Sequence, residues 1–196
     1  MWPWDHVALA YLSYALYARA TGRRPSDATA LAVVIAAVAP DMIDKPLSWW
    51  VGVLPSGRSL GHSAFTAVVV VAAAGVVQRR VGPAGLTPAV AFGYVSHLLG
   101  DVAYPLIVKR ELRTGFLSWP LVASDSEAVE SAFGHLGDLA AAFAAYLSTP
   151  AGIAYLLADL TLLSAALAVW LADGAPGVHM LRRAVAHRRS NRDGDR

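Results

Sequence analysis

An imidazole and a carboxylate lie four residues apart near the end of the longest apolar stretch of the chain, in the sequence Ser96-His97-Leu98-Leu99-Gly100-Asp101. Four residues make about one turn of a helix, so His97 and Asp101 share one face of it. Ionisable residues inside a membrane-length helix cost a few kcal/mol or more, and they usually face a polar cavity or one another and mark a function. An imidazole beside a carboxylate is suited to holding a metal ion.

Three other parts of the sequence supply groups of the same kind. We expect His6 at the start of a first helix, an aspartate pair just past the end of a second, and His62 at the start of a third. In an up-and-down bundle consecutive helices alternate in direction, so these positions arrive at the same end as the histidine and aspartate of the fourth helix. The sequence therefore predicts one ion-holding pocket near one membrane surface, formed by His6, Asp41, Asp44, His62, His97 and Asp101.

The chemistry of this pocket follows from its donors. Imidazoles and carboxylates bind divalent Zn, Mn or Fe, with Zn our first choice, and the absence of cysteine excludes thiolate sites and disulfides. The donors suffice for one ion, or for two bridged by a carboxylate. Because a metal lowers the pKa of a bound water, the expected reaction is hydrolysis of a phosphoester or other ester of a lipid or membrane-associated substrate. We expect Asp44 and Arg58 to act in catalysis, and Arg58 with Lys45 to hold an anionic headgroup.

The composition indicates a membrane protein. Of 196 residues, 56% are hydrophobic and 15% charged, and the mean hydropathy is +0.47, which is too apolar for an ordinary soluble domain. We expect an all-α, multi-pass helical bundle in the cell membrane over residues 1–176, with up-and-down helices, and a basic, partly disordered tail over 177–196. Membrane lipid and a small or lipid-linked substrate are the expected partners, without nucleic acid. The tail's basic residues are Arg182, Arg183, Arg188, Arg189, Arg192 and Arg196.

Periodicity and capping signals place the helices. We expect Pro40 to end the second helix and residues 41–61 to form a long interfacial loop. Ser124 to Glu127 fits a capping box for an alanine-rich helix. The predicted helices cover about 3–20, 28–39, 59 or 61 to 80, 87–108, a segment ending near 147, and 151–172. The third helix is predicted to carry a polar face of Ser59, His62, Ser63 and Thr66, and the fourth a stripe of Gly93, His97, Gly100, Asp101 and Tyr104.

Basic residues outside the tail do not decide how the bundle is oriented. The end opposite the pocket carries Arg19, Arg23, Arg24, Arg79 and Arg80, and the pocket end carries Lys45, Arg58, Lys109, Arg110 and Arg113. The positive-inside rule therefore gives a tie. The position of the tail would break it, and this depends on whether the alanine-rich segment after Ser126 crosses the bilayer or lies on it.

These motifs resemble those of the YdjM-type membrane-bound metal-dependent hydrolases. The resemblance covers roughly residues 1–110 and rests on His6, Pro40-Asp41 with Asp44, Gly61-His62-Ser63 and Ser96-His97-x-x-x-Asp101. That family is distantly similar to zinc-dependent phospholipase C, an all-helical fold with His and Asp ligands in comparable order. The resemblance implies that Asp101 bridges two ions and that the ligands are His6, Asp41, His62, His97 and Asp101. The phospholipases carry a later HxxxE pair, where this chain has only His135 and Asp138, so a third metal is not expected.

Other functions stay open at this point. Pro55-Ser56-Gly57 and the HxxxD spacing are similar to motifs of the type 2 phosphatidic acid phosphatases, which are metal-independent lipid phosphate phosphatases. Arg58, however, stands where the first of those motifs has His, and Ala91 where the second has Arg. A metal-ion-binding transporter without hydrolytic activity would place polar residues through the full membrane depth, whereas here they gather at one end. A noncatalytic scaffold, in which His97 and Asp101 only lock two helices together, is the third alternative.

Overall fold

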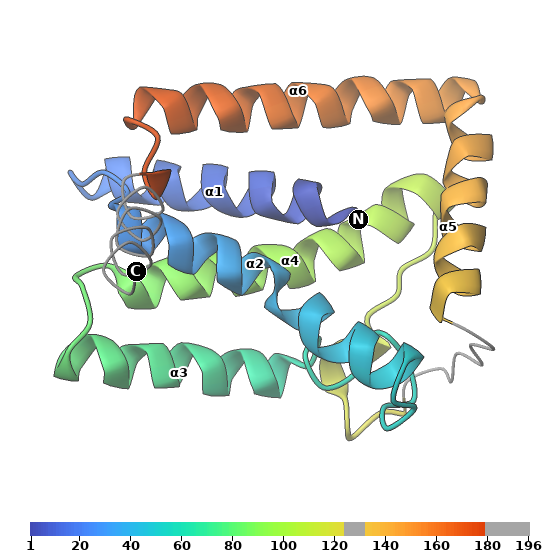
Figure 1. Cartoon of the computed structure of the whole chain (residues 1–196), viewed down its shortest axis with the longest axis horizontal. Helices are drawn as coiled ribbons and strands as arrows, with labels where there is room; N and C mark the ends of the chain where they lie inside the picture. The colour runs from blue at the N-terminus through green and yellow to red at the C-terminus, as the bar shows by residue number, and fades with distance from the viewer. Residues whose placement is uncertain (124–131, 179–196) are drawn as a thin grey trace, which may run out of the picture.

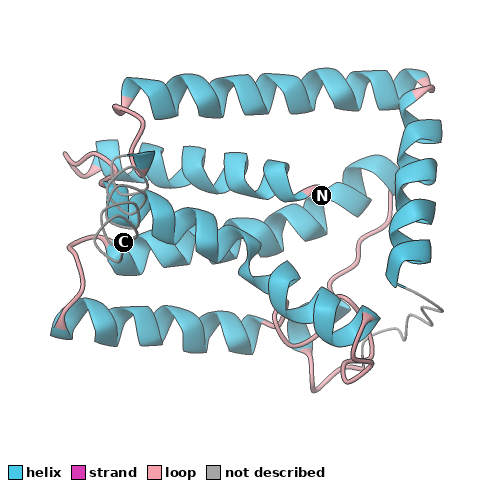
Figure 2. Ribbon diagram, in the orientation of Figure 1, coloured by secondary structure: helices cyan, strands magenta, loops and turns pink. Residues whose placement is uncertain are grey.

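The computed structural model describes residues 1–123 and 132–178. Over these residues the chain is all helical, as the sequence predicts, and contains no strand (Figures 1 and 2). A short 3-10 helix covers Gly115–Ser118. The α-helices are α1 (Pro3–Ala20), α2 (Asp27–Trp49), α3 (Ala64–Arg80), α4 (Leu86–Lys109), α5 (Ala132–Leu147) and α6 (Pro150–Ala172).

Helices α2 and α4 cross closely at the centre of the molecule, with α1 packed against both. Small residues permit this approach: a Cβ placed on Gly93 of α4 would lie 2.7 Å from the Cβ of Ala36 and 2.7 Å from the carbonyl oxygen of Val33 on α2. Small residues at helix crossings are typical of membrane bundles, where they let backbones come together. The buried cluster between these helices is Ala10, Tyr14, Ala18, Val33, Ala37 and Ala89.

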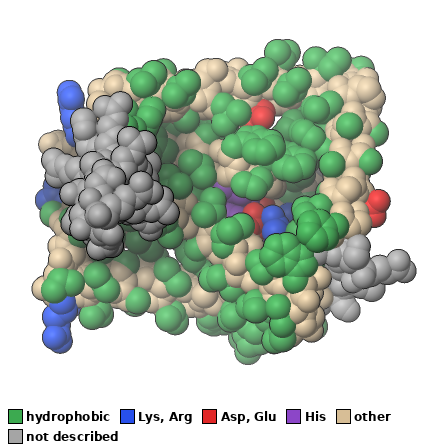
Figure 3. Space-filling model, viewed as in Figure 1, with side chains coloured by type: hydrophobic (Ala, Val, Ile, Leu, Met, Phe, Trp, Pro, Cys, Tyr) green, Lys and Arg blue, Asp and Glu red, His purple; other side chains and the backbone are tan. Residues whose placement is uncertain are grey.

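The outer surface of the bundle is apolar. On α3 the side chain of Val68 is 70% exposed, and on α6 that of Leu157 is 62% exposed. Figure 3 shows hydrophobic side chains over most of the visible face. Among the described residues, two helices are by length and composition apolar enough to cross a membrane, over Leu86–Val108 and Pro150–Ala172. The carboxylates of Asp41, Asp44 and Asp101 are instead buried inside the bundle, an arrangement that suits a lipid surrounding.

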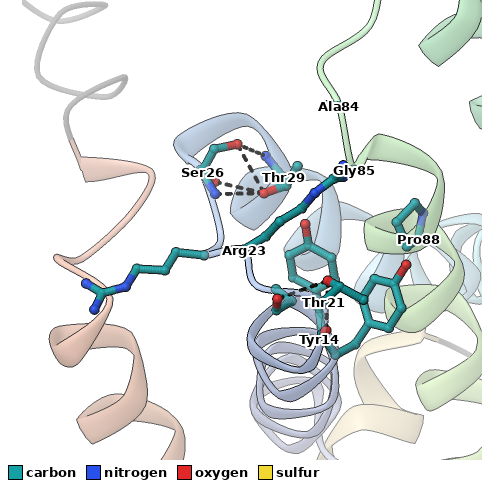
Figure 4. Close-up of a pocket in the computed structure, with 11 residues that line it drawn as sticks. Tyr14, Thr21, Arg23, Ser26, Thr29, Ala84, Gly85 and Pro88 are labelled. Carbon is teal, nitrogen blue, oxygen red and sulfur yellow. Dashed lines mark hydrogen bonds between the residues drawn. The ribbon is translucent and has the colours of Figure 1, made fainter.

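One end of the bundle carries Arg19, Arg23, Arg24, Arg79 and Arg80, and we call it the arginine end. Here α1 ends at Ala20 and α2 begins after Ser26, whose hydroxyl accepts a hydrogen bond from the backbone of Thr29. A small pocket at this end is lined by Tyr14, Thr21, Arg23 and Gly85 (Figure 4). The pocket contains no member of the predicted metal site, which lies toward the other end.

The sequence prediction for the second helix is wrong, because α2 does not stop at Pro40. It continues through Pro40 and Pro46 to Trp49, so the predicted loop over 41–61 begins only after Trp49. A proline inside a helix removes one backbone hydrogen bond and commonly bends the helix rather than ending it. Figure 1 shows such a bend in α2. Asp41 and Asp44 are therefore helical residues less than one turn apart.

The third helix also begins later than predicted. Ser63 caps it, accepting a hydrogen bond from Phe65 N, so Ser59 and His62 belong to the preceding loop and not to a helical face. The predictions for α1, α6 and the end of α5 at Leu147 are confirmed. The predicted capping box at 124–127 and the basic tail from residue 179 onward lie outside the described residues.

Candidate metal centre

Three histidine rings from three separate segments meet in the interior of the bundle. His6 comes from α1, His62 from the loop before α3, and His97 from α4, and each is at most 1% exposed. The rings of His6 and His97 stack with their centroids 3.8 Å apart, and the ring of His62 meets that of His97 edge-on at 4.9 Å. The convergence predicted from helix order is confirmed for the histidines.

Two carboxylates complete the cluster. Asp41 on α2 places Oδ1 3.5 Å from His62 Nε2 and 3.9 Å from His97 Nε2. Asp101 on α4 places Oδ2 3.4 Å from His62 Nε2 and Oδ1 3.3 Å from His6 Nε2. Two overlapping groups have all their ligand atoms within 4.8 Å of one another: His6, Asp41 and His97, and His62, His97 and Asp101. All five predicted ligands thus lie in one cluster.

The outer nitrogens of two rings are fixed by hydrogen bonds. His97 Nδ1 donates to the carbonyl oxygen of Ala37 at 2.6 Å, and His62 Nδ1 donates to Asp44 Oδ2 at 2.8 Å. Since a carbonyl oxygen only accepts, the Nδ1 of His97 carries the proton and its Nε2 has a lone pair. The two Nε2 atoms face each other at 3.1 Å, beside the oxygens of Asp41 and Asp101. Fixing Nδ1 in this way is how proteins orient an imidazole toward a metal.

Asp44 lies just outside the cluster and organises the loop that carries His62. Its carboxylate accepts hydrogen bonds from the backbone of Ser59 at 2.7 Å, Gly61 at 2.7 Å and His62 at 3.2 Å, besides the bond from the His62 ring. Gly61 permits this contact, because a Cβ there would lie 2.8 Å from the carbonyl oxygen of Pro40. The Tyr94 hydroxyl donates to the carbonyl oxygen of Gly61. These contacts describe a positioning residue, and the catalytic role predicted for Asp44 stays a prediction.

Cations also contact the two carboxylates of the cluster. Lys45 Nζ lies 2.6 Å from Asp41 Oδ2, and Arg58 Nε lies 2.9 Å from Asp101 Oδ2. The amino group of Met1 lies 3.2 Å from Asp101 Oδ1. The Arg58 side chain is 36% exposed, so it connects the buried cluster with the surface. Figure 3 shows a histidine, an acidic and a basic side chain together in the middle of the apolar face.

The surroundings of His62 favour its charged form. Burial opposes protonation of the ring, but hydrogen bonds to Asp101, Asp41 and Asp44 outweigh burial and raise the pKa of His62 to about 10. Positive charge is therefore favoured at this position, and at neutral pH the protonated ring of His62 provides this charge when no metal is bound.

Buried polar atoms of His6 provide a direct test of whether a metal fits. Neither ring nitrogen of His6 makes a well-formed hydrogen bond among the described residues, although the ring is 1% exposed and its Nε2 lies 3.3 Å from Asp101 Oδ1. Leaving a buried polar group without a partner costs about 1–3 kcal/mol. The Nε2 atom of His6 faces Asp101, and His6 is a member of one of the two candidate ligand groups. A coordinated ion would satisfy this nitrogen, so the residues present fit a metal.

Sequence reasoning missed the atoms that orient the rings. The carbonyl oxygen of Ala37 carries no sequence signal, since every residue has one. Gly61 and Ser59 could have been noticed as neighbours of His62, but their backbone bonds to Asp44 depend on the loop conformation. His135, which with Asp138 stands in place of a later HxxxE pair, is half-buried edge-on against Trp49, with ring centroids 4.8 Å apart, and does not join the cluster.

Comparison with known proteins agrees with the resemblance seen in the motifs and extends it. No curated protein and no solved structure shows a significant match to the chain. A sequence model of a protein family described as YdjM inner membrane protein matches residues 1–176, and so continues well beyond the last of the metal-site motifs. The chain belongs to the YdjM inner membrane protein family.

Proposed function

We propose that this protein is a multi-pass, metal-dependent hydrolase of the inner membrane that cleaves a phosphoester or another ester of a lipid or membrane-associated substrate. The observation that carries the proposal is the pair of facing Nε2 atoms of His62 and His97, 3.1 Å apart beside two carboxylates. The lone pair of His97 Nε2 and the negative charge of both carboxylates are directed at one point in a buried site, where a divalent cation that displaces the proton of His62 would be stabilised.

The ligands of the proposed ion are His6, Asp41, His62, His97 and Asp101. Nitrogen and carboxylate donors without thiolate favour Zn, with Mn or Fe as the other choices. Asp101 directs one oxygen toward His6 and the other toward His62, which supports a bridging role between two ions. Bound by these residues, such an ion would supply Lewis-acid chemistry and lower the pKa of a water molecule enough for attack at neutral pH.

The neighbouring residues have distinct tasks in this proposal. Asp44 holds the His62 ring and the loop around it, so that Nε2 is aimed before any ligand arrives. Arg58 contacts Asp101 from the exposed side and is placed to bind the anionic part of a phosphoester, while Lys45 neutralises Asp41. Preorganised charges of this kind lower the energy of charge that develops in a transition state.

The apolar interior next to the cluster favours hydrolysis over ion transport. Between the cluster and the arginine end, the described part of α1, α2 and α4 is packed with Ala10, Tyr14, Val33, Ala37 and Ala89. A transport path needs polar groups through the whole membrane depth to replace the hydration of the ion. This packing instead supports a site that is reached from one side only.

The multi-pass arrangement is supported by the distribution of side chains. Exposed valines and leucines cover α3 and α6, and the ionisable residues of the cluster face inward. Helix α3 has 17 residues, about 26 Å at 1.5 Å per residue, which is close to the roughly 30 Å of a hydrocarbon core.

Metal analysis of the detergent-purified protein tests the proposal. We expect the wild type to retain at least one equivalent of a transition metal, and the His62→Ala and His97→Ala variants to lose most of it. His135→Ala is the matched control, because His135 lies outside the cluster. Hydrolysis of bis(p-nitrophenyl) phosphate and p-nitrophenyl butyrate, with and without a strong chelator, then tests the reaction. Unchanged metal content in both variants, or hydrolysis that survives the chelator, would contradict it.

A further inference from the structure

The structure supplies the information on membrane orientation that the count of basic residues in the sequence does not. Apart from the tail, five basic residues lie at each end of the bundle, so the orientation depends on the end at which the tail leaves it. Arginines and lysines close to the ends of spanning helices determine which side stays in the cytoplasm. The path of the chain from α4 to α6 determines at which end of the bundle the tail begins.

Helix α5 does not return the chain to the arginine end. Figure 1 shows α5 lying across the direction of α6, at the end of the molecule where α6 begins. Its contacts are with residues near the metal centre: Phe143 packs against Trp2 with centroids 4.8 Å apart, and His135 packs against Trp49. The segment after Ser126, which the sequence left open between crossing and lying flat, thus lies flat over its described residues.

Helix α6 then runs back to the arginine end and is fixed there. The carboxylate of Asp173, directly after α6, accepts a hydrogen bond from Arg19 Nη2 at 2.8 Å and another from the Tyr11 hydroxyl at 2.9 Å. Gly177 N donates to Asp27 Oδ1 at 2.7 Å, at the start of α2. The described chain therefore ends at the arginine end, and the tail sequence that follows begins there.

We propose that the arginine end faces the cytoplasm and that the metal centre opens to the outer face of the inner membrane. The tail adds Arg182, Arg183, Arg188, Arg189 and Arg192 within about 20 residues of the end of α6, the distance over which the positive-inside rule counts. At the opposite end, Lys45 and Arg58 are engaged with the carboxylates of the cluster.

The depth of the centre is consistent along three helices. On α1, His6 precedes Arg19 by 13 residues, or about 20 Å of helix. On α3, Ala64, which follows the His62 loop, precedes Arg79 by 15 residues, or about 22 Å, and on α4, His97 follows Leu86 by 11 residues, or about 17 Å. In a hydrocarbon core of roughly 30 Å these distances place the centre in the half remote from the arginines.

This orientation deepens the proposed function and, for its substrate, rests on it. The substrate class is an ester or phosphoester held in the outer leaflet, with its polar headgroup presented to the outer aqueous side. A soluble cytoplasmic ester is excluded, because the apolar packing of α1, α2 and α4 lies between the centre and the cytoplasm.

The absence of cysteine makes a clean test possible, because one introduced thiol is the only one in the chain. Thr114→Cys places a thiol in the exposed loop after α4, and Val81→Cys places one at an 87% exposed position of the arginine end. Neither residue belongs to the metal centre. Each full-length variant is treated in right-side-out bacterial spheroplasts with a charged, membrane-impermeant maleimide, before and after permeabilisation, with detergent-solubilised protein as the labelling control.

We expect Thr114→Cys to be labelled in intact spheroplasts and Val81→Cys only after permeabilisation. The reverse pattern, labelling of both in intact spheroplasts, or labelling of neither before permeabilisation, would each overturn the orientation. The labelling results do not depend on the metal content of the protein, so failure of the orientation proposal can be distinguished from failure of the hydrolase proposal. Replacing the tail arginines with glutamine leaves equal numbers of basic residues at the two ends of the bundle, so we expect molecules in both orientations and labelling of both positions. An unchanged labelling pattern would refute the role of the tail in setting the orientation.

Discussion

Asp44 offers a sharp test of how the metal centre is assembled, through the nearly isosteric substitution Asp44→Asn. The carboxylate accepts four hydrogen bonds, three at Oδ2 and one at Oδ1 from Gly61 N. An asparagine that keeps its oxygen in the Oδ2 position turns its amide toward Gly61 N, so two donors then face each other. The volume is unchanged, and the substitution therefore tests charge and hydrogen bonding alone.

The size of the effect follows from these bonds. Losing one hydrogen bond to a charged group costs about 1.5–3 kcal/mol, and the three that remain lose their charge assistance. We expect the free energy of unfolding to fall by about 2–4 kcal/mol in detergent. With the His62 ring held less firmly, metal affinity should fall about 10- to 100-fold, the range seen when a residue that orients a metal-binding histidine is replaced.

Competition for zinc against a chromophoric chelator measures this affinity on the purified protein, and thermal unfolding measures the stability. Asp138→Asn on α5 is the matched control, because that carboxylate is exposed and remote from the cluster. Zinc affinity of Asp44→Asn within twofold of wild type would refute the positioning role. A loss of turnover at unchanged affinity would instead assign Asp44 to catalysis, as the sequence analysis predicted.

Three further predictions concern packing, metal removal and pH. Gly93→Ala inserts a Cβ 2.7 Å from α2 and should lower stability by about 1–3 kcal/mol on thermal unfolding, whereas Gly137→Ala, with no atom within 4 Å of its added Cβ, should be neutral or stabilising. Chelator treatment should lower the Tm, and free zinc at 100 times its Kd should restore about 2.7 kcal/mol, whereas a Tm indifferent to zinc would contradict the site. Because the pKa of His62 is raised to about 10, zinc must displace its proton at neutral pH. Affinity should therefore rise as pH increases from 7 to 9, with proton release visible as a buffer-dependent binding enthalpy, and a pH-independent affinity would refute the charged state of His62.

Much of the fold could be predicted because long apolar segments with clear caps allow few alternatives. The bounds of α1 and α6 follow from the proline near each start and the end of the apolar run. The prediction was wrong at α2, where local rules treat Pro40 as a stop. Packing of α2 against α4 keeps the helix continuous through the missing hydrogen bond, and no local signal reports that contact.

The sequence predicted which residues form the candidate site, but not which loop and hydrogen bonds position them. His6, Asp41, His62, His97 and Asp101 could be chosen because ionisable residues are rare in so apolar a chain, and helix reversal brings them to one end. The placement of His62 on a helical face was wrong, since a loop tied to Asp44 carries it. A loop conformation depends on contacts between distant residues, which spacing alone does not contain.

By itself the sequence determined the all-helical class of the protein, the bounds of most of its helices, the donors available to a metal and the exclusion of thiolate chemistry, because these depend on residue type and local periodicity. Only the tertiary structure decided which nitrogen of each ring faces the centre, that Asp44 orients His62, and that α6 returns to the arginine end. The physical reason is that these features arise from hydrogen bonds between residues far apart in the chain, such as His97 with Ala37 and Arg19 with Asp173. Such pairings exist only once the helices have packed.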